Sequence, residues 1–166
     1  MIDESTASYR HTQKAPWHYL LDAIGVGVLV TAMLSNEPLY AHWLMAGLGT
    51  LFLLLGASFQ HLTVEDQGNH LDIHFGPLPL FRRSIPYEDI RGIEVGRTMF
   101  LDGWGIHVSL RGGWVWNIWG RDCVVIRLER GTLRVGTDDV ANLAAILRSR
   151  VGKSMFQDPA DDSLDM

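Results

Sequence analysis

The chain of 166 residues contains only one cysteine, Cys123, so it cannot form an intramolecular disulfide. The strand-like surroundings of Cys123 predict a small buried thiol rather than a reactive one. The chain also lacks a surplus of basic charge, because residues 60–153 carry twelve Lys and Arg against eleven Asp and Glu. A nucleic-acid-binding domain is expected to be clearly basic, so no nucleic-acid partner is predicted.

Sequence signatures of catalysis are missing as well. No Gly-x-Ser-x-Gly, phosphate-binding loop or HExxH motif occurs. His70, Asp72 and His74 alternate along a predicted strand and therefore share one face, where such side chains could ligate zinc. No comparable signature accompanies them, so a solvated strand face is favoured over a metal site. We expect no enzyme, no cofactor and no identifiable small-molecule substrate.

Two long runs, residues 17–34 and 39–59, contain no lysine, arginine or glutamate. As α-helices they would span about 27 and 32 Å, close to the ~30 Å hydrocarbon core of a bilayer. The turn at residues 35–38 is so short that the helices must be antiparallel. Residues 17–59 are therefore predicted to form a transmembrane helical hairpin, which makes the lipid bilayer a partner.

Basic residues set the predicted orientation of this hairpin. Arg10 and Lys14 precede the first helix and the turn contains no Lys or Arg, so the positive-inside rule places both termini in the cytoplasm of a bacterial inner membrane. Residues 1–16 are polar and lack the pattern of a removable signal peptide. They are expected to form a flexible cytoplasmic tail.

Positions on the two helices that are equally far from the turn lie at the same depth in the membrane. Glycines of both helices then lie at similar depths, so the two helices are predicted to approach closely there. The same comparison of depths sets Asp22 opposite about Leu51, roughly one turn inside the cytoplasmic boundary. An interfacial or capping role and a contact with an ion or partner both remain open for this carboxylate. The glycines predicted to pack in the hairpin are Gly25, Gly27, Gly47 and Gly49.

Residues 60–152 change to short runs in which apolar residues alternate, separated by glycine-containing turns. This pattern predicts an antiparallel meander of half-buried strands, preceded by a hairpin at 61–75 and an edge strand at 80–87. From Asp138 to about Arg150 the spacing becomes helical and is expected to stop at a glycine. Residues 153–166 form an acidic tail that is predicted to be disordered.

An ordered series of glycine, tryptophan and Gly-Thr-Asp marks runs through this region. It comprises Ile85-Pro-Tyr-Glu-Asp-Ile-Arg-Gly-Ile-Glu94, Gly103-Trp-Gly-Ile106, Gly113-Trp-Val-Trp-Asn117 with Gly120, and Gly131 through Arg134-Val-Gly-Thr-Asp138 before a helix. The series resembles the bacterial pleckstrin-homology-like (PH-like) domain family, many of whose members carry a preceding transmembrane pair. The resemblance covers about residues 61–151. It implies a bent antiparallel sheet of about seven strands, capped by a C-terminal helix.

The resemblance implies a binding or assembly module rather than an enzyme. Phosphoinositide-binding relatives use basic residues around their first hairpin. The corresponding turn here, Gln67-Gly68-Asn69, has no Lys or Arg, so inositide binding is not expected.

Four of the six tryptophans fall close together, with arginines nearby. They could form a contact surface for a peptide, a partner protein or lipid headgroups, or they could serve only core and turn packing. A further arginine pair could touch anionic headgroups. The candidate contact residues are Trp104, Trp114, Trp116, Trp119, Arg97 and Arg121, and the arginine pair is Arg82 and Arg83.

The sequence as a whole predicts an α+β membrane protein that presents a PH-like binding or assembly module to the cytoplasm. A protein partner or self-association is expected. The alternative is a small subunit or accessory protein of an oligomeric membrane complex or transporter, with a hairpin that oligomerises and a functional Asp22.

Overall fold

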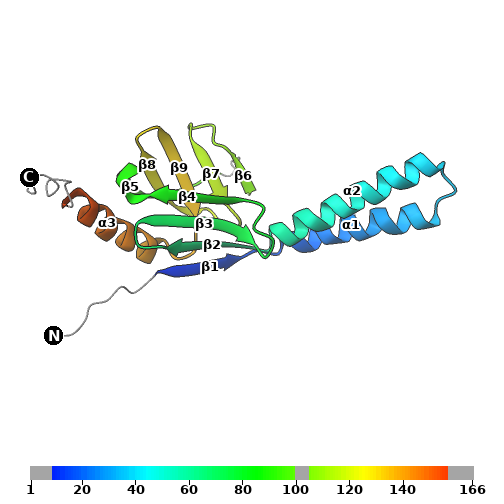
Figure 1. Ribbon diagram of the computed structural model, residues 1–166, viewed down its shortest axis with the longest axis horizontal. Helices are drawn as coiled ribbons and strands as arrows, with labels where there is room; N and C mark the ends of the chain where they lie inside the picture. The colour runs from blue at the N-terminus through cyan, green and yellow to red at the C-terminus, as the bar shows by residue number, and fades with distance from the viewer. Residues whose placement is uncertain (1–8, 100–104, 157–166) are drawn as a thin grey trace, which may run out of the picture. The chain divides into compact units, whose positions relative to one another are not determined.

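The computed structural model describes residues 9–99 and 105–156, with only the backbone for residues 153–156. Helices and strands follow one another along the chain as Figure 1 shows. In chain order they are β1 (Arg10–Lys14), α1 (Trp17–Leu34), α2 (Leu39–Ser58), β2 (His61–Asp66), β3 (His70–Gly76), β4 (Arg82–Pro86), the 3-10 turn η1 (Tyr87–Asp89), β5 (Ile90–Arg97), β6 (Gly105–Val108), β7 (Trp114–Asn117), β8 (Asp122–Leu128), β9 (Gly131–Gly136) and α3 (Val140–Phe156).

The described strands form two sheets. A four-stranded sheet has the order β1-β2-β3-β4, and a five-stranded sheet has the order β5-β8-β9-β7-β6. Two long apolar helices, two sheets and a C-terminal helix confirm the predicted α+β class. The hairpin predicted at 61–75 and the edge strand predicted at 80–87 are also confirmed, as β2–β3 and β4.

The second sheet is not the predicted meander. Strand β9 returns beside β8 through a tight turn and then pairs in parallel with β7. A meander requires each strand to pair with its neighbour in sequence, whereas β8 pairs with β5 and β9. Within the described residues, 60–152 contain eight strands rather than about seven.

The polar segment before the first helix is not a flexible tail throughout, because Arg10–Lys14 form the edge strand β1. The backbone N–H of Ala15 donates a hydrogen bond to the carbonyl of Gln60 at 3.3 Å, and the hydroxyl oxygens of Thr12 and Thr63 lie 2.9 Å apart. An edge strand can keep one face in water, so its sequence need not be apolar.

Contacts divide the chain into two compact units. The helix unit comprises Thr12–Thr63 and Ile73–Arg83 and contains α1 and α2. The sheet unit comprises Met1–His11, Val64–Asp72 and Ser84–Met166 and contains β5 to β9 and α3.

In the sheet unit, α3 packs against η1, β5 and β8. Leu143, Ala144 and Leu147 are fully buried at helical spacing, as predicted. The helix begins at Val140, and the hydroxyl of Thr137 accepts a hydrogen bond from the N–H of Asp139 at 3.0 Å. It does not stop at Gly152 but continues to Phe156, so the first residues of the predicted tail are helical. The acidic remainder of that tail lies outside the described residues.

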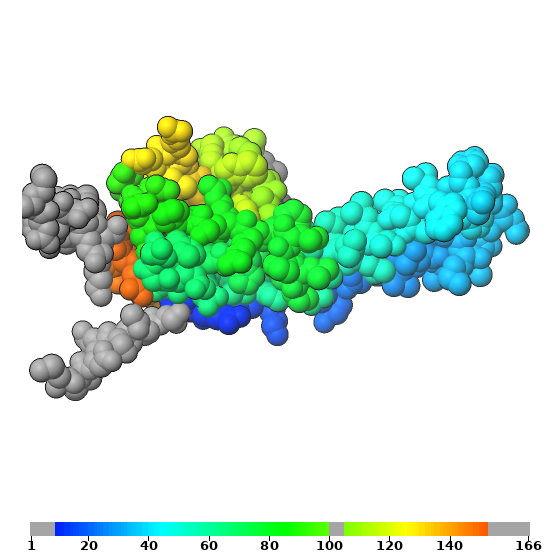
Figure 2. Space-filling view, in the orientation of Figure 1, coloured from blue at the N-terminus to red at the C-terminus, as the bar shows by residue number. Residues whose placement is uncertain are grey.

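In the helix unit, α1 and α2 pack side by side in antiparallel directions. Both helices are long and apolar enough to cross a membrane, and only 11% of each candidate span is buried inside the protein. Figure 2 shows their side chains uncovered along the face in view.

Candidate functional site

The turn that joins β6 to β7 is a rigid projection of the sheet unit. The N–H of Ser109 donates to the carbonyl of Gly113, and the N–H of Gly112 donates to the carbonyl of Ser109, both at 2.9 Å. Gly112 and Gly113 have φ angles of +76° and +84°, which L side chains rarely adopt. Arg134 also donates to the carbonyl of Gly112 at 2.6 Å, so the turn is fixed from both sides.

This turn carries an apolar surface with one cation beside it. Val108 lies directly opposite Trp114 in the β6–β7 pair, and Leu110 is 78% exposed at the turn. Trp114 is 47% exposed, and Arg111 beside it is exposed. We call Val108, Leu110, Arg111 and Trp114 the hairpin-tip surface. Large apolar side chains on a rigid turn are suited to binding another protein, because little conformational entropy is lost on contact.

The structure separates the four predicted tryptophans. Trp114 is exposed at the start of β7, but Trp116 is 7% exposed and belongs to the core. Trp119 is exposed but follows the other end of β7, so it does not join the hairpin-tip surface. Trp104 lies outside the described residues.

Two of the predicted contact arginines are exposed but make contacts within the chain. Arg97 donates to the carboxylate of Asp122 at 2.8 Å, and the N–H of Thr98 donates to the carbonyl of Arg121 at 2.7 Å. The Arg121 side chain also donates to the carbonyl of Thr98 at 3.4 Å. These contacts join the end of β5 to the start of β8.

The face formed by β5, β8 and β9 carries a shallow polar groove of about 570 Å³. Arg127 in this groove pairs with Glu94 at 2.8 Å, and both side chains are exposed. Exposed pairs of this kind contribute little to stability or affinity. The groove therefore has less to offer a ligand than the hairpin-tip surface.

The predicted metal-ligand pattern does not form a metal site. Asp72 is buried and His70 and His74 are half-buried, so the expected solvated face of β3 is wrong at its centre. No group of three or more His, Cys, Asp or Glu side chains that could hold a metal is found in the part of the chain that the structure describes. Cys123 is fully buried, as predicted.

Two of the four predicted hairpin glycines lie where α1 and α2 meet. A Cβ on Gly25 would lie 2.9 Å from the carbonyl oxygen of Gly49, and a Cβ on Gly49 would lie 3.0 Å from the carbonyl oxygen of Gly25. Gly27 and Gly47 are exposed, and a Cβ on either would meet no atom within 4 Å. Gly25 and Gly49 therefore lie in the contact between α1 and α2, whereas Gly27 and Gly47 lie outside it.

Asp22 faces Gly56 rather than the vicinity of Leu51. Its carboxylate fills the space that a side chain on Gly56 would occupy. Helical side chains lean toward the N-terminus of their own helix, which moves the Asp22 carboxylate about one turn toward the end of the hairpin where α1 begins. Matching residues of the two helices by their distance from the turn places only the Cα atoms and does not include this displacement of the side chain.

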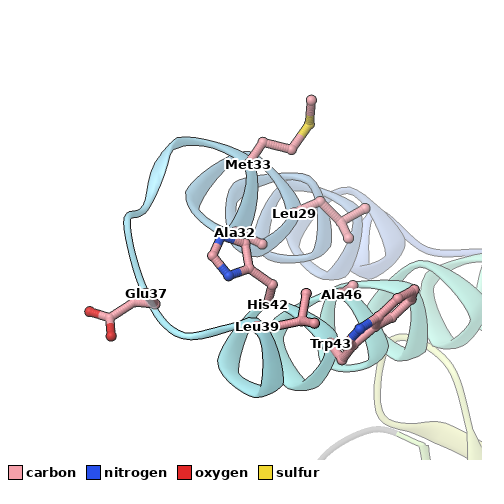
Figure 3. Close-up of a pocket in the computed structure, with 8 residues that line it drawn as sticks. All are labelled: Leu29, Ala32, Met33, Glu37, Leu39, His42, Trp43 and Ala46. Carbon is pink, nitrogen blue, oxygen red and sulfur yellow. The ribbon is translucent and has the colours of Figure 1, made fainter.

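The turn end of the hairpin contains an open apolar groove of about 610 Å³ (Figure 3). The two ring nitrogens of His42 lie 3.2 Å from the carbonyl oxygens of Pro38 and Ser35, so the imidazole secures the turn. The Glu37 carboxylate points away from the other side chains of the groove. This arrangement explains how the short turn is held.

Asp66 is the centre of a buried polar network that the sequence did not reveal. The hydroxyl of Tyr87 donates to its carboxylate at 2.7 Å, the N–H of Gly68 at 2.8 Å and the guanidinium of Arg150 at 2.9 Å. Burial alone would raise the pKa of Asp66, but these three donors outweigh it and hold the pKa below the ordinary value of 3.8. Burial, reinforced by the Asp66 carboxylate, raises the pKa of Tyr87.

The network joins three segments of the sheet unit, namely the β2–β3 turn, η1 and α3. An Asp before a glycine turn signals only the local contact with Gly68. The distant donors Tyr87 and Arg150 leave no periodic mark in the sequence. We assign the network to stability rather than to ligand binding, because the Asp66 side chain has no exposed surface.

Comparison with protein-family models finds no match to this chain, and a search of curated proteins finds no similar sequence.

Proposed function

We propose that this chain is a two-pass membrane protein that presents a PH-like binding or assembly module to the cytoplasm of a bacterial cell. The observation that carries the membrane part is the pairing of β1 with β2 around the hairpin. Segments immediately before α1 and after α2 are hydrogen-bonded in one sheet, through Ala15 and Gln60 and through Thr12 and Thr63. Both segments must therefore lie on one side of a membrane, which requires an even number of crossings.

The surface of the helices supports the same proposal. A core helix of a water-soluble protein is mostly buried, whereas these two apolar helices are mostly uncovered. Exposed apolar area is unfavourable in water by about 25 cal/mol per Å², and a bilayer removes that cost. Removal of α1 as a signal sequence would also take away β1, which belongs to the folded sheet.

The topology can be tested by cysteine labelling in intact bacterial cells. We expect a membrane-impermeant maleimide to label Asn36→Cys from outside, because residue 36 lies in the exposed turn between the helices. Arg130→Cys, at an exposed position in the sheet unit, is expected to react only after permeabilisation. The reverse pattern would contradict the orientation, and labelling of both from outside would contradict a spanning hairpin.

The hairpin-tip surface supports the binding part of the proposal. Its exposed leucine and tryptophan are displayed on a turn fixed by backbone hydrogen bonds. Tryptophan and arginine are the residue types that most often dominate the energy of protein interfaces. The occupant we propose is a protein partner or a second copy of the chain.

Substitutions at this surface test the binding proposal. We expect Leu110→Ser with Trp114→Ala to reduce the yield of a partner cross-linked and purified from membranes by about 30-fold, equivalent to about 2 kcal/mol for a tryptophan contact. Val95→Ser is the matched control, because Val95 is also exposed on the same sheet but lies on β5. An unchanged yield with the double variant, with the fold intact, would contradict the assignment.

The alternative, a small subunit of an oligomeric complex, requires the helical hairpin itself to bind other transmembrane helices. Gly27 and Gly47 leave open surface on α1 and α2, where another helix could approach. Loss of assembly with Gly47→Leu, while the hairpin-tip variant retains its partners, would favour that alternative.

A further inference from the structure

The connection between β3 and β4, residues 76–81, lies beside the last turn of α2 (Figure 1). The ring of Phe59, which caps α2, lies 4.9 Å from the ring of Phe75 and 5.2 Å from the ring of Phe81. The N–H of Phe75 donates to the carbonyl of Phe81 at 3.0 Å, which closes the loop at its base. The loop is therefore held at the level where α2 ends.

The residues just after α2 fix the loop further. The N–H of Gln60 donates to the carbonyl of Gly76 at 3.1 Å. The imidazole of His61 lies so close that a Cβ on Gly76 would be 2.5 Å from its Nε2 atom. The start of the loop consequently has no freedom to swing away from the helix.

Beyond this base the loop presents apolar side chains outward. Leu80 is 61% exposed, and Leu78 is also exposed. Pro77 and Pro79 have no backbone N–H, and the N–H of Leu80 donates to the carbonyl of Leu78 at 2.8 Å. Such a backbone has few donors that require water, which suits it to the boundary of a bilayer.

Two cationic side chains of the helix unit lie near this loop. Arg82 is its neighbour in the sequence, and Lys14 precedes Ala15, whose N–H donates to Gln60, the residue that in turn donates to Gly76. Both cationic side chains are exposed, and Lys14 lies three residues before α1 begins. Lysine and arginine near the ends of spanning helices are drawn to anionic headgroups.

We propose that the β3–β4 loop is a membrane wedge, in which Leu78 and Leu80 enter the boundary between headgroups and acyl chains. The leaflet is the one in which α1 begins and α2 ends, and Lys14 and Arg82 contact its anionic headgroups. The wedge rests on the proposed membrane-spanning hairpin, because the twenty residues of α2 would span about 30 Å and bring Phe59 to the interface. It fixes the depth at which this end of the helix unit meets the leaflet.

The test uses the full chain in vesicles of phosphatidylcholine and phosphatidylglycerol, with a fluorophore on a single introduced cysteine. Leu80→Cys reports the loop, Val26→Cys reports the exposed side of α1, and Val95→Cys is an exposed control in the sheet unit, outside the hairpin-tip surface. Cys123 is fully buried, so the unmodified chain gives the labelling background. Iodide quenches probes in water, and lipids brominated at different chain depths quench probes in the bilayer.

We expect iodide quenching at position 80 to be several-fold lower than at position 95, with strong quenching at position 80 by lipid brominated close to the headgroup. Equal iodide quenching at the two positions overturns the wedge. Protection from iodide without quenching by any brominated lipid also overturns it, because protein would then cover the loop. If the Val26→Cys probe is not quenched by deeply brominated lipid, the spanning hairpin itself fails, independently of the result at position 80.

Discussion

Replacing Asp66 with alanine is expected to lower the free energy of unfolding by about 3–5 kcal/mol. The Asp66 side chain is fully buried, and that of its partner Arg150 is only 16% exposed. The substitution leaves the guanidinium and the Tyr87 hydroxyl without their shared acceptor in a poorly hydrated site. Denaturant unfolding of the full chain in detergent micelles, followed through tryptophan fluorescence, measures the change.

Two further variants separate the network from general effects of charge removal. Glu129→Ala removes an ion pair with Arg91 in which both side chains are exposed, so little or no loss of stability is expected. Tyr87→Phe removes a single donor from Asp66 and is expected to cost about 1–2 kcal/mol. An Asp66→Ala protein no less stable than Glu129→Ala would show that the network contributes nothing to the fold.

The same network sets an acid limit on stability. Because the folded-state pKa of Asp66 is lowered, its contribution is complete above the ordinary value of 3.8 and disappears as pH falls through the lower folded value. The unfolding free energy of the natural chain should decrease in that interval. Asp66→Asn should lack this part of the decrease, since an amide does not titrate there.

Gly49→Leu is expected to destabilise the helical hairpin by about 1–3 kcal/mol, the usual cost of forcing extra carbon atoms into a packed contact. A Cβ at this position would lie 2.7 Å from Leu29 Cγ and 3.0 Å from the carbonyl oxygen of Gly25. The leucine side chain can move, but the carbonyl of α1 can yield only if the helices separate. The thermal unfolding midpoint in detergent reports the loss.

Gly47→Leu is the matched control for Gly49→Leu, since it places the same side chain two residues away on the same helix. A Cβ there meets no atom within 4 Å, and leucine favours a helix over glycine by nearly 1 kcal/mol in water. We therefore expect stability to be unchanged or slightly increased. Equal destabilisation by both substitutions would contradict the assigned contact between α1 and α2.

The sequence predicted those features that repeat over many residues. Two apolar runs joined by a four-residue turn identified the helices, and alternation identified the hairpin at 61–75 and most other strands. Matching residues by their distance from the turn found Gly25 and Gly49 but could not exclude Gly27 and Gly47, because small residues occur on more than one face of each helix. The face in contact depends on helix rotation, which these nearly uniform apolar sequences do not specify.

Features that depend on distant partners could not be predicted in this way. Trp114 and Trp116 lie two residues apart on β7 and each has a partner residue on both neighbouring strands, yet Trp116 is buried while Trp114, at the strand end beside the turn, is exposed. The parallel pairing of β7 with β9 is likewise a choice between non-neighbouring strands. The polar residues of β1 gave no sign of a strand because its partner β2 is separated from it by the whole hairpin.

The position of β1 also constrains the order in which the protein can be assembled during synthesis. The ribosome releases β1 first, then both helices, and only afterwards its partner β2. The first sheet therefore stays incomplete until the hairpin has been made and, on our proposal, inserted. A chain whose second helix failed to insert would hold β1 and β2 on opposite sides of the membrane and leave β2 as an unpaired edge, which favours aggregation or proteolysis. Completion of this sheet thus distinguishes correctly inserted chains from misinserted ones.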